Sequence, residues 1–248
     1  MTRIVKIGGN ELDDSGFIRG LVGALSRVGR RTVLVHGGGK EISQLQTRLG
    51  LQARTVDGLR VTDPESLDVA QMVLVGLVNK RLVAALVAAG IDALGLCGID
   101  RGLVLAEKLE HTGGDLGRVG QVGTVRVDVF KRLLEEGVMP VLAPICGSGD
   151  GQPYNVNADH VAEAVARALG ARELVFVSNV PGVLVAGQLA AQLTPAQASA
   201  LVADGTIHGG MIPKIRSAVE AVARGVAAVR ITDLAGLERG TGTTVVRG

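Results

Sequence analysis

Two short glycine runs, each following an apolar segment, are the residues in this sequence best suited to hold an anion. Lys6 precedes Gly8 and Gly9, and His36 runs directly into Gly37-Gly38-Gly39. Glycines let a ligand approach the backbone closely, and their N–H groups, together with a helix N-terminus, supply partial positive charge. Either run alone is explained equally well by a tight turn from a strand into a helix. Two such runs, one of them preceded by a lysine, favour an anion site.

Common phosphate-binding and metal-binding motifs do not describe these runs. Gly39-Lys40 is followed by Glu41, where a Walker A loop has Ser or Thr, and the spacing is not that of a dinucleotide fingerprint. The protein-kinase signatures and the G-x-S-x-G elbow of the α/β-hydrolases are also missing from the sequence. The four histidines and two cysteines have no metal-ligand spacing, so we expect no protein metal site.

Three other segments carry polar residues just before predicted helices or within a strand. Asn155, Asn157 and Asp159 precede a helical stripe, where Asn157 or Asp159 could serve as a helix cap. Lys214 also stands before a helical run, as a surface lysine would, and Arg60 lies in an extended segment that suits an exposed strand residue. None of these residues identifies a chemistry by itself.

Apolar runs and helical stripes alternate along the chain, which predicts an α/β fold around a mainly parallel sheet. With only 2% aromatic residues, the core must consist of Val, Leu, Ile and Ala. We expect strands at 3–7, 32–36, 93–97, 139–145, 174–178, 227–231 and 243–246. We expect helices at 15–28, 40–49, 64–89, 128–136, 159–169, 195–203 and 215–223, a hairpin at 52–62, and a meander at 102–125 on one edge of the sheet. A renewed strand–helix rhythm suggests a lobe boundary near Gly170.

The composition argues against nucleic-acid and membrane partners. Lys and Arg total 26 against 24 Asp and Glu, without a basic run, so a nucleic-acid surface is not expected. The N-terminus has no secretory signal pattern, and the apolar run around 72–78 is broken by Gly76 and by Asn79-Lys80, so we predict no membrane span. Cys97 and Cys146 follow apolar runs and are expected to be buried, reduced thiols, as in a soluble cytoplasmic protein.

Seven motifs taken together resemble the amino-acid kinase family, and they follow the order found in that family. They are KIGG at 6–9, VHGGG at 35–39, DGLRVTD at 57–63, LVNK at 77–80, YNVNAD at 154–159, SNVPG at 178–182 and GGMIPK at 209–214. The resemblance implies a three-layer αβα sandwich (the amino-acid kinase fold). Residues 1–170 would form an N-terminal lobe that binds the acylated amino acid and dimerises, and residues 171–248 a C-terminal lobe that binds the nucleotide.

The resemblance also implies roles for individual residues. Lys6, Lys214 and Asp159 resemble the catalytic set, with the carboxylate orienting the two lysines. Arg60 and Asn155 match substrate contacts, with Arg60 on the α-carboxylate, and Gly38 and Gly39 resemble the donors around the substrate. The residues that resemble nucleotide or phosphate contacts are Gly8, Gly9, Asn179, Val180, Pro181, Gly182, Val183 and Leu184.

The activity implied by the resemblance is phosphorylation of the side-chain carboxylate of N-acetyl-L-glutamate by MgATP. That carboxylate has an ordinary pKa of about 4.3 and is already ionised at neutral pH, so no general base is needed. Positioning and positive charge are the main requirements, and Mg²⁺ is expected to be held mainly by the phosphates.

Three alternatives stay open at this stage. They are a kinase that acts on carrier-protein-linked aminoadipate in lysine synthesis, another kinase of the same fold (carbamate, aspartate or uridylate), and a catalytically silent sensor of amino acid or nucleotide. Because the first strand begins at Arg3, we expect no extra N-terminal helix. We therefore expect an arginine-insensitive homodimer, with the helix at 64–89 supplying much of its interface.

Overall fold

A central sheet organises the chain, and its strands are mostly parallel. The computed structural model describes residues 1–9, 11–29, 31–56 and 59–248, and within these ranges eight strands form the sheet in the order β14-β16-β15-β11-β1-β2-β8-β5. Every pairing except β15–β16 is parallel. The strands are β1 (Arg3–Ile7), β2 (Thr32–His36), β5 (Ala93–Cys97), β8 (Met139–Ala143), β11 (Glu173–Val177), β14 (Gln192–Leu193), β15 (Ala228–Thr232) and β16 (Thr243–Val246).

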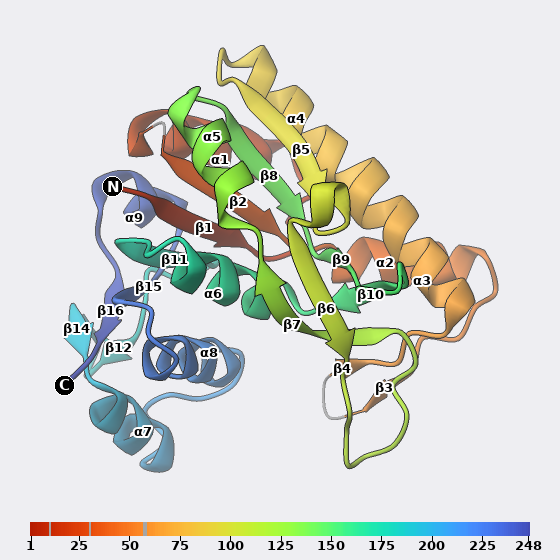
Figure 1. The fold of residues 1–248 in the computed structure, drawn as a ribbon. Coiled ribbons are helices and arrows are strands. Elements are labelled where there is room, and N and C mark those ends of the chain that lie inside the picture. The colour runs from red at the N-terminus through yellow and green to blue at the C-terminus, as the bar shows by residue number, and fades with distance from the viewer. Residues whose placement is uncertain (10, 30, 57–58) are drawn as a thin grey trace.

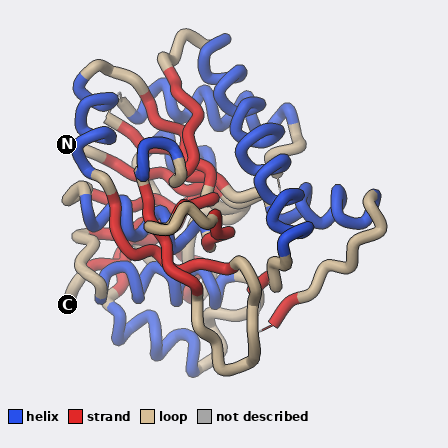
Figure 2. The backbone as a smooth tube through the Cα atoms, turned by 45° about the vertical axis from the view of Figure 1, so that its right-hand side comes forward, coloured by secondary structure: helices blue, strands red, loops and turns tan. Residues whose placement is uncertain are grey.

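Helices cover both faces of this sheet, and Figure 2 shows the strands as an inner layer with helices on either side. Side chains of the inner strands alternate between two apolar clusters: Ile4 packs in one and Val5 in the other. The cluster around Val5 includes residues of α1 (Ser15–Val28), α2 (Gly39–Arg48), the long helix at 64–88 and α9 (Leu234–Arg239). The cluster around Ile4 includes residues of α5 (Val127–Glu135), α6 (Ala158–Ala168), α7 (Pro195–Ala203) and α8 (Met211–Ala223). The predicted three-layer αβα sandwich is confirmed.

The long helix predicted at 64–89 is present, but its middle has a different geometry. It consists of α3 (Pro64–Gln71), the π-helical segment η1 (Met72–Val78) and α4 (Asn79–Ala88). Asp63 caps its start by accepting a hydrogen bond from the Ser66 backbone N–H, and Pro64 occupies the first turn.

Gly76 and Asn79-Lys80 interrupt the apolar run of this helix, but the helix itself continues through them, as the predicted range 64–89 requires. Among the described residues, Pro64–Ala88 is one helix long and apolar enough, by length and composition, to cross a membrane. A core helix of a soluble protein passes the same test, and 44% of the most apolar window is buried.

Residues 102–125 do not form an edge of the central sheet, contrary to the sequence prediction. Their strands β6 (Val104–Lys108) and β7 (Val119–Val125) join β9 (Ile145–Gly147) and β10 (Pro153–Val156) in a small closed barrel (Figure 1). The predicted strand at 139–145 is divided between β8 and β9, because Pro144 has no N–H to continue the parallel ladder. The chain therefore passes at Pro144 from β8 of the central sheet into β9 of the barrel.

Short elements complete the chain. The predicted hairpin appears as β3 (Thr55–Val56) and β4 (Leu59–Arg60), which are antiparallel, and its turn residues 57–58 lie outside the described residues. The sequence did not predict α9, the one-turn helix η2 (Asp100–Gly102), or the hairpin of β12 (Leu184–Val185) and β13 (Gln188–Leu189). Because β11 pairs directly with β1, one sheet runs through residues 1–170 and 171–248, and their division into two functional lobes stays a proposal.

Candidate functional site

A cavity of about 310 Å³ opens at the carboxyl ends of β1 and β2, where α2 and α6 begin. This is the place where open parallel sheets bind their ligands. The cavity is lined by Lys6, Gly37, Gly38, Gly39, Ile42, Thr55, Leu59, Arg60, Leu74, Val119, Pro144, Asn155, Val156, Asn157, Ala158 and Asp159. Six residues that the sequence selected (Lys6, Gly38, Gly39, Arg60, Asn155 and Asp159) are therefore brought together, although they come from four separate segments.

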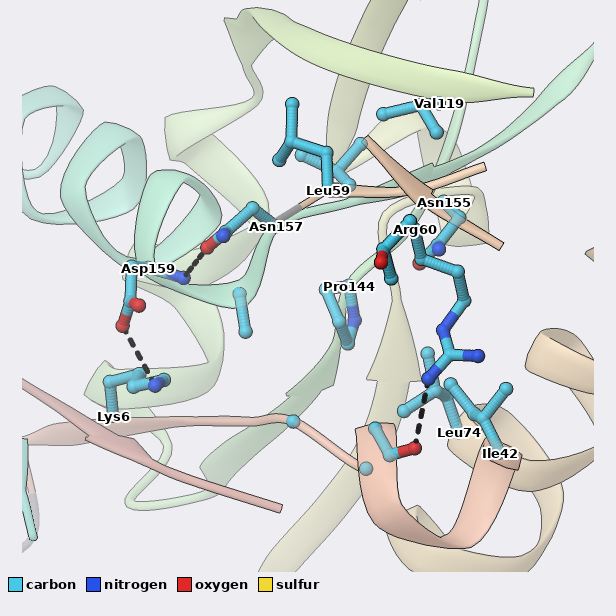
Figure 3. A pocket seen from close by; sticks show the side chains of 16 residues that line it. Lys6, Ile42, Leu59, Arg60, Leu74, Val119, Pro144, Asn155, Asn157 and Asp159 are labelled. Atoms are coloured by element: carbon cyan, nitrogen blue, oxygen red, sulfur yellow. Dashed lines mark hydrogen bonds and ion pairs between the residues drawn. The ribbon is translucent and has the colours of Figure 1, made fainter. Parts of the chain in front are cut away.

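Lys6 and Asp159 form an ion pair at one side of the cavity (Figure 3). Lys6 Nζ lies 2.8 Å from Asp159 Oδ1, and the two side chains are 16% and 28% exposed. Lys6 comes from β1, and Asp159 from the first turn of α6. Asn157 caps that helix, since its Oδ1 accepts a hydrogen bond of 2.7 Å from the Asp159 backbone N–H. The capping interpretation is thus confirmed for Asn157, and the Asp159 carboxylate is available to Lys6.

The two glycine runs pack against each other. The Gly37 N–H donates to the Ile7 carbonyl at 3.1 Å, which joins the end of β2 to the end of β1. A Cβ atom on Gly9 would come 2.4 Å from the backbone nitrogen of Gly38, and one on Gly38 would come 2.6 Å from Leu74 Cδ2. A side chain at position 9 would collide with backbone, and one at position 38 would require the Leu74 side chain to move. The glycines of the second run line the cavity.

His36 fixes the start of the second glycine run from inside the protein. Its side chain is fully buried, and burial lowers its pKa to about 4, so the ring is neutral at physiological pH. The Asn79 side-chain amide donates to His36 Nε2 at 3.1 Å. Nδ1 therefore carries the proton and donates to the Gly37 carbonyl at 2.9 Å. Asn79 follows η1 directly, so the long helix contributes to the geometry of the glycine run.

Arg60 and Asn155 lie on the other side of the cavity from Lys6 in the view of Figure 3. Arg60 is half-buried, and burial lowers the pKa of its guanidinium. It donates to the Gly39 carbonyl at 3.1 Å, and Asn155 Nδ2 donates to Thr62 Oγ1 at 3.3 Å. A cation and an amide at one end and a lysine at the other suit a small ligand with two anionic groups.

The apolar part of the cavity was not predicted from the sequence. Ile42, Leu59, Leu74, Val119 and Pro144 line it, and each belongs to a different element or loop. Leu59 lies within the motif at 57–63, but the other four belong to none of the motifs, so only the fold could identify them.

Three groups of predicted site residues do not line this cavity. Lys214 is in the first turn of α8, and within the described part of the chain no ion pair joins it to Asp159. In the segment 179–184, Gly182 has a φ of 146° and is pressed against Thr243, whose Oγ1 accepts a 2.8 Å hydrogen bond from the Val183 N–H. Val183 is buried and Leu184 is exposed. These residues do not line the cavity, nor do Gly8 and Gly9, and their predicted contacts with the nucleotide stay predictions.

Comparison with known proteins places the chain in one family. The model of the Amino acid kinase family matches residues 1–233. The chain belongs to this family.

Two curated relatives have the same name. The chain is 55% identical over 245 residues to a protein of Roseiflexus sp. (strain RS-1) named acetylglutamate kinase, covering 99% of this chain and 93% of the relative. A protein of the same name from Methanopyrus kandleri is 45% identical over 250 residues, covering 98% and 99%. Among solved structures, N-acetylglutamate synthase from Neisseria gonorrhoeae, complexed with coenzyme A and N-acetyl-glutamate, superposes with a TM-score of 0.84 at 25% identity. That match covers 100% of this chain and 59% of the synthase.

Proposed function

We propose that this protein transfers the γ-phosphoryl group of ATP to the side-chain carboxylate of N-acetyl-L-glutamate, giving N-acetyl-L-glutamyl 5-phosphate, a step of arginine biosynthesis. The observation that carries the proposal is one cavity holding Lys6–Asp159 at one end and Arg60 with Asn155 at the other. The names of relatives more than half identical to this chain support the same substrate.

The two ends of the cavity fit the two carboxylates of that substrate. Arg60 is suited to the α-carboxylate, because a guanidinium offers several donors in a planar fork. The side-chain carboxylate then points toward Lys6 and the backbone of Gly38 and Gly39. The apolar wall, with Leu59 and Leu74, is suited to the methyl group of the acetyl unit.

Charge stabilisation, and not proton transfer, is the chemical task of these residues. The attacking carboxylate is already ionised, and charge spreads over the phosphoryl oxygens as the transfer proceeds. A lysine and backbone N–H groups aimed at those oxygens would stabilise that charge without reorganisation. Asp159 holds the Lys6 ammonium in place, since the 2.8 Å contact fixes its direction.

We place Lys214 in the catalytic set with Lys6. Its helix, α8, is tied to the helix that carries Asp159, because buried Glu163 of α6 pairs at 3.2 Å with Arg224, which directly follows α8. A second lysine beside Asp159 requires that carboxylate to offset the repulsion between like charges.

The nucleotide is proposed to bind as MgATP in the lobe formed by residues 171–248, with the segment 179–184 in contact with it. Within the described ranges, no group of three or more His, Cys, Asp or Glu could hold a metal ion. A Mg²⁺ ion that enters with the phosphates and keeps several waters suits such a site.

We also propose a cytoplasmic homodimer built on the long helix at 64–88. Met72, Leu77 and Val87 of this helix are 56%, 51% and 54% exposed, and Leu94 of the neighbouring edge strand β5 is 43% exposed. Large apolar side chains gathered on one helix and the adjacent strand are typical of a protein interface. In Figure 1 this helix and β5 lie together at the outer edge of the sheet.

The decisive experiment measures ADP release with MgATP and N-acetyl-L-glutamate while hydroxylamine traps the acyl phosphate. Free glutamate, aspartate, carbamate and carrier-linked aminoadipate are assayed in parallel. Turnover with acetylglutamate and not with the other acceptors is expected. Turnover only with the carrier-linked substrate would indicate a kinase of lysine synthesis. No turnover with any acceptor would favour a catalytically silent sensor of amino acid or nucleotide.

A further inference from the structure

The guanidinium of Arg60 is held by one side of helix α2. Nη1 of Arg60 donates to Gln46 Oε1 at 2.6 Å, and Nη2 donates to Ser43 Oγ at 2.7 Å and to the Gly39 carbonyl at 3.1 Å. The three acceptors are spaced along α2 at intervals of four and three residues, which places them on one side of the helix. Figure 3 shows Arg60 reaching from its strand toward the start of this helix.

Gln46 is the most enclosed of these acceptors, and its orientation is fixed. It is 1% exposed, and its Nε2 donates to Ser66 Oγ at 2.9 Å. Ser66 is itself buried in the first turn of α3, where its N–H donates to Asp63 Oδ1 at 2.7 Å. Arginine has only donors, so Gln46 must present its oxygen to Arg60 and its NH₂ to Ser66. A buried amide with both ends paired cannot rotate without leaving a polar group unsatisfied.

Gln46 is uncharged, and this matters for the charge of Arg60 as much as its position matters for the orientation of Arg60. Arg60 has five N–H donors, and three are assigned to acceptors on α2. All three acceptors are uncharged, so the positive charge of Arg60 is not cancelled by a protein carboxylate among these contacts. The guanidinium is therefore oriented by the protein and still available to an anion.

We propose that Gln46 is a positioning residue that fixes the Arg60 guanidinium for the α-carboxylate of the acyl amino acid, and so determines selectivity for acceptors that carry this carboxylate. The inference rests on the proposed function for the assignment of the α-carboxylate to Arg60. It adds a residue that does not line the cavity and that no motif marks.

The test compares two ligands that differ only in the α-carboxylate. N-acetyl-L-glutamate carries it, whereas 4-acetamidobutyrate retains the acetamido group and the reacting carboxylate but lacks it. Their dissociation constants are measured by calorimetry on the wild type, on Gln46→Met, and on Gln44→Met as the matched control. Gln44 is an exposed glutamine of the same helix. Arg60→Ala shows the full effect of losing the guanidinium.

In Gln46→Met, the dissociation constant for N-acetyl-L-glutamate should rise about tenfold, the scale expected for a lost hydrogen bond to a charged group. The constant for 4-acetamidobutyrate should stay within about twofold, and Gln44→Met should match the wild type for both ligands. Ser66→Ala is a milder change. It should raise the dissociation constant for N-acetyl-L-glutamate by a smaller factor and leave that for 4-acetamidobutyrate nearly unchanged. In steady-state assays, KM for N-acetyl-L-glutamate should rise in Gln46→Met while kcat and KM for ATP change little.

Equal weakening of both ligands in Gln46→Met, or no weakening of either, would overturn the proposal. If Gln46→Met does not fold, Ser66→Ala decides by the same comparison. The proposed function fails separately: a wild type that binds N-acetyl-L-glutamate but never phosphorylates it refutes the kinase assignment and leaves the positioning role of Gln46 intact. A wild type that binds neither ligand refutes both.

Discussion

Gly9 lies so close to Gly38 that a Cβ atom on Gly9 would come within 2.4 Å of the Gly38 backbone nitrogen. The two residues follow adjacent parallel strands, β1 and β2, and each belongs to a glycine run at the carboxyl end of its strand. This contact packs the glycine run after β1 directly against the glycine run after β2. The position of the glycines that line the cavity therefore depends on a residue that does not line it.

Gly9→Ala should lower kcat/KM by about 100-fold, because the added methyl group must push Gly38 away and misplace the backbone donors that follow it. Gly23→Ala is the matched control. Gly23 is an exposed residue of α1 with nothing within 4 Å of an added Cβ, and this substitution should leave activity unchanged and stabilise the helix slightly. Steady-state kinetics and thermal unfolding of both variants check the prediction, and wild-type kcat/KM in Gly9→Ala would show that the contact is not needed.

Asp159→Asn should lower kcat by about 100-fold or more while changing stability little. The amide keeps the size of the carboxylate but cannot pair with Lys6, so the ammonium loses its fixed direction and any second lysine is repelled. The control is Asp128→Asn, which breaks the exposed ion pair with Arg126 and should leave kcat unchanged. The check is kcat at saturating substrates together with the unfolding midpoint. A variant with normal kcat would remove Asp159 from the catalytic set.

The sequence predicts the central sheet well, because its strands are buried on both faces and read as continuous apolar runs. The predicted bounds of β1 and β2 match the structure residue for residue. The small barrel was missed because its strands pair across long sequence separations, as β10 does with β7, and because Pro144 divides two strands that read as one run. The π-helical segment at 72–78 was missed because an apolar stretch without charges fits several helical periods.

The residues of the site also fall into those that the sequence predicted and those that it missed. The second glycine run, Lys6, Arg60 and Asp159 belong to compact motifs, and the structure brings them to one cavity. Gln46 has no such mark, because its contact with Arg60 joins a helix to a separate hairpin and depends on the packing of α2. Local spacing predicts residues that act through the backbone or through a motif, whereas a partner that comes from another element is visible only in the fold.

Leu77→Glu should convert the proposed homodimer to a monomer. Leu77 is 51% exposed on the long helix, and a carboxylate there would be desolvated without a partner if this surface forms an interface. Leu49→Glu is the control, since Leu49 is 56% exposed at the end of α2, outside the long helix. Light scattering of the wild type should give twice the chain mass of 25.4 kDa, with the control unchanged and Leu77→Glu at the single mass. A wild type that is monomeric would reject the proposed assembly.

Protonation of His36 should make the protein lose stability between about pH 6.5 and pH 4. Burial lowers the pKa of His36 from 6.5 to about 4 in the folded chain, because the enclosed ring cannot accommodate a charge. Below pH 6.5 the unfolded chain therefore binds a proton that the folded chain does not, and the free energy of unfolding falls as the pH is lowered. The contribution is fully present above pH 6.5 and is lost by about pH 4, with a total of about 3 kcal/mol at 1.36 kcal/mol per pKa unit.

Urea unfolding of the wild type and of His36→Gln, at intervals from pH 4 to pH 8, measures this difference. His36→Gln should be less stable at neutral pH but should lose less stability across this window, while the exposed His208→Gln should follow the wild type. Parallel pH curves for wild type and His36→Gln would mean that His36 titrates normally in the folded protein and that its ring is not held neutral by burial.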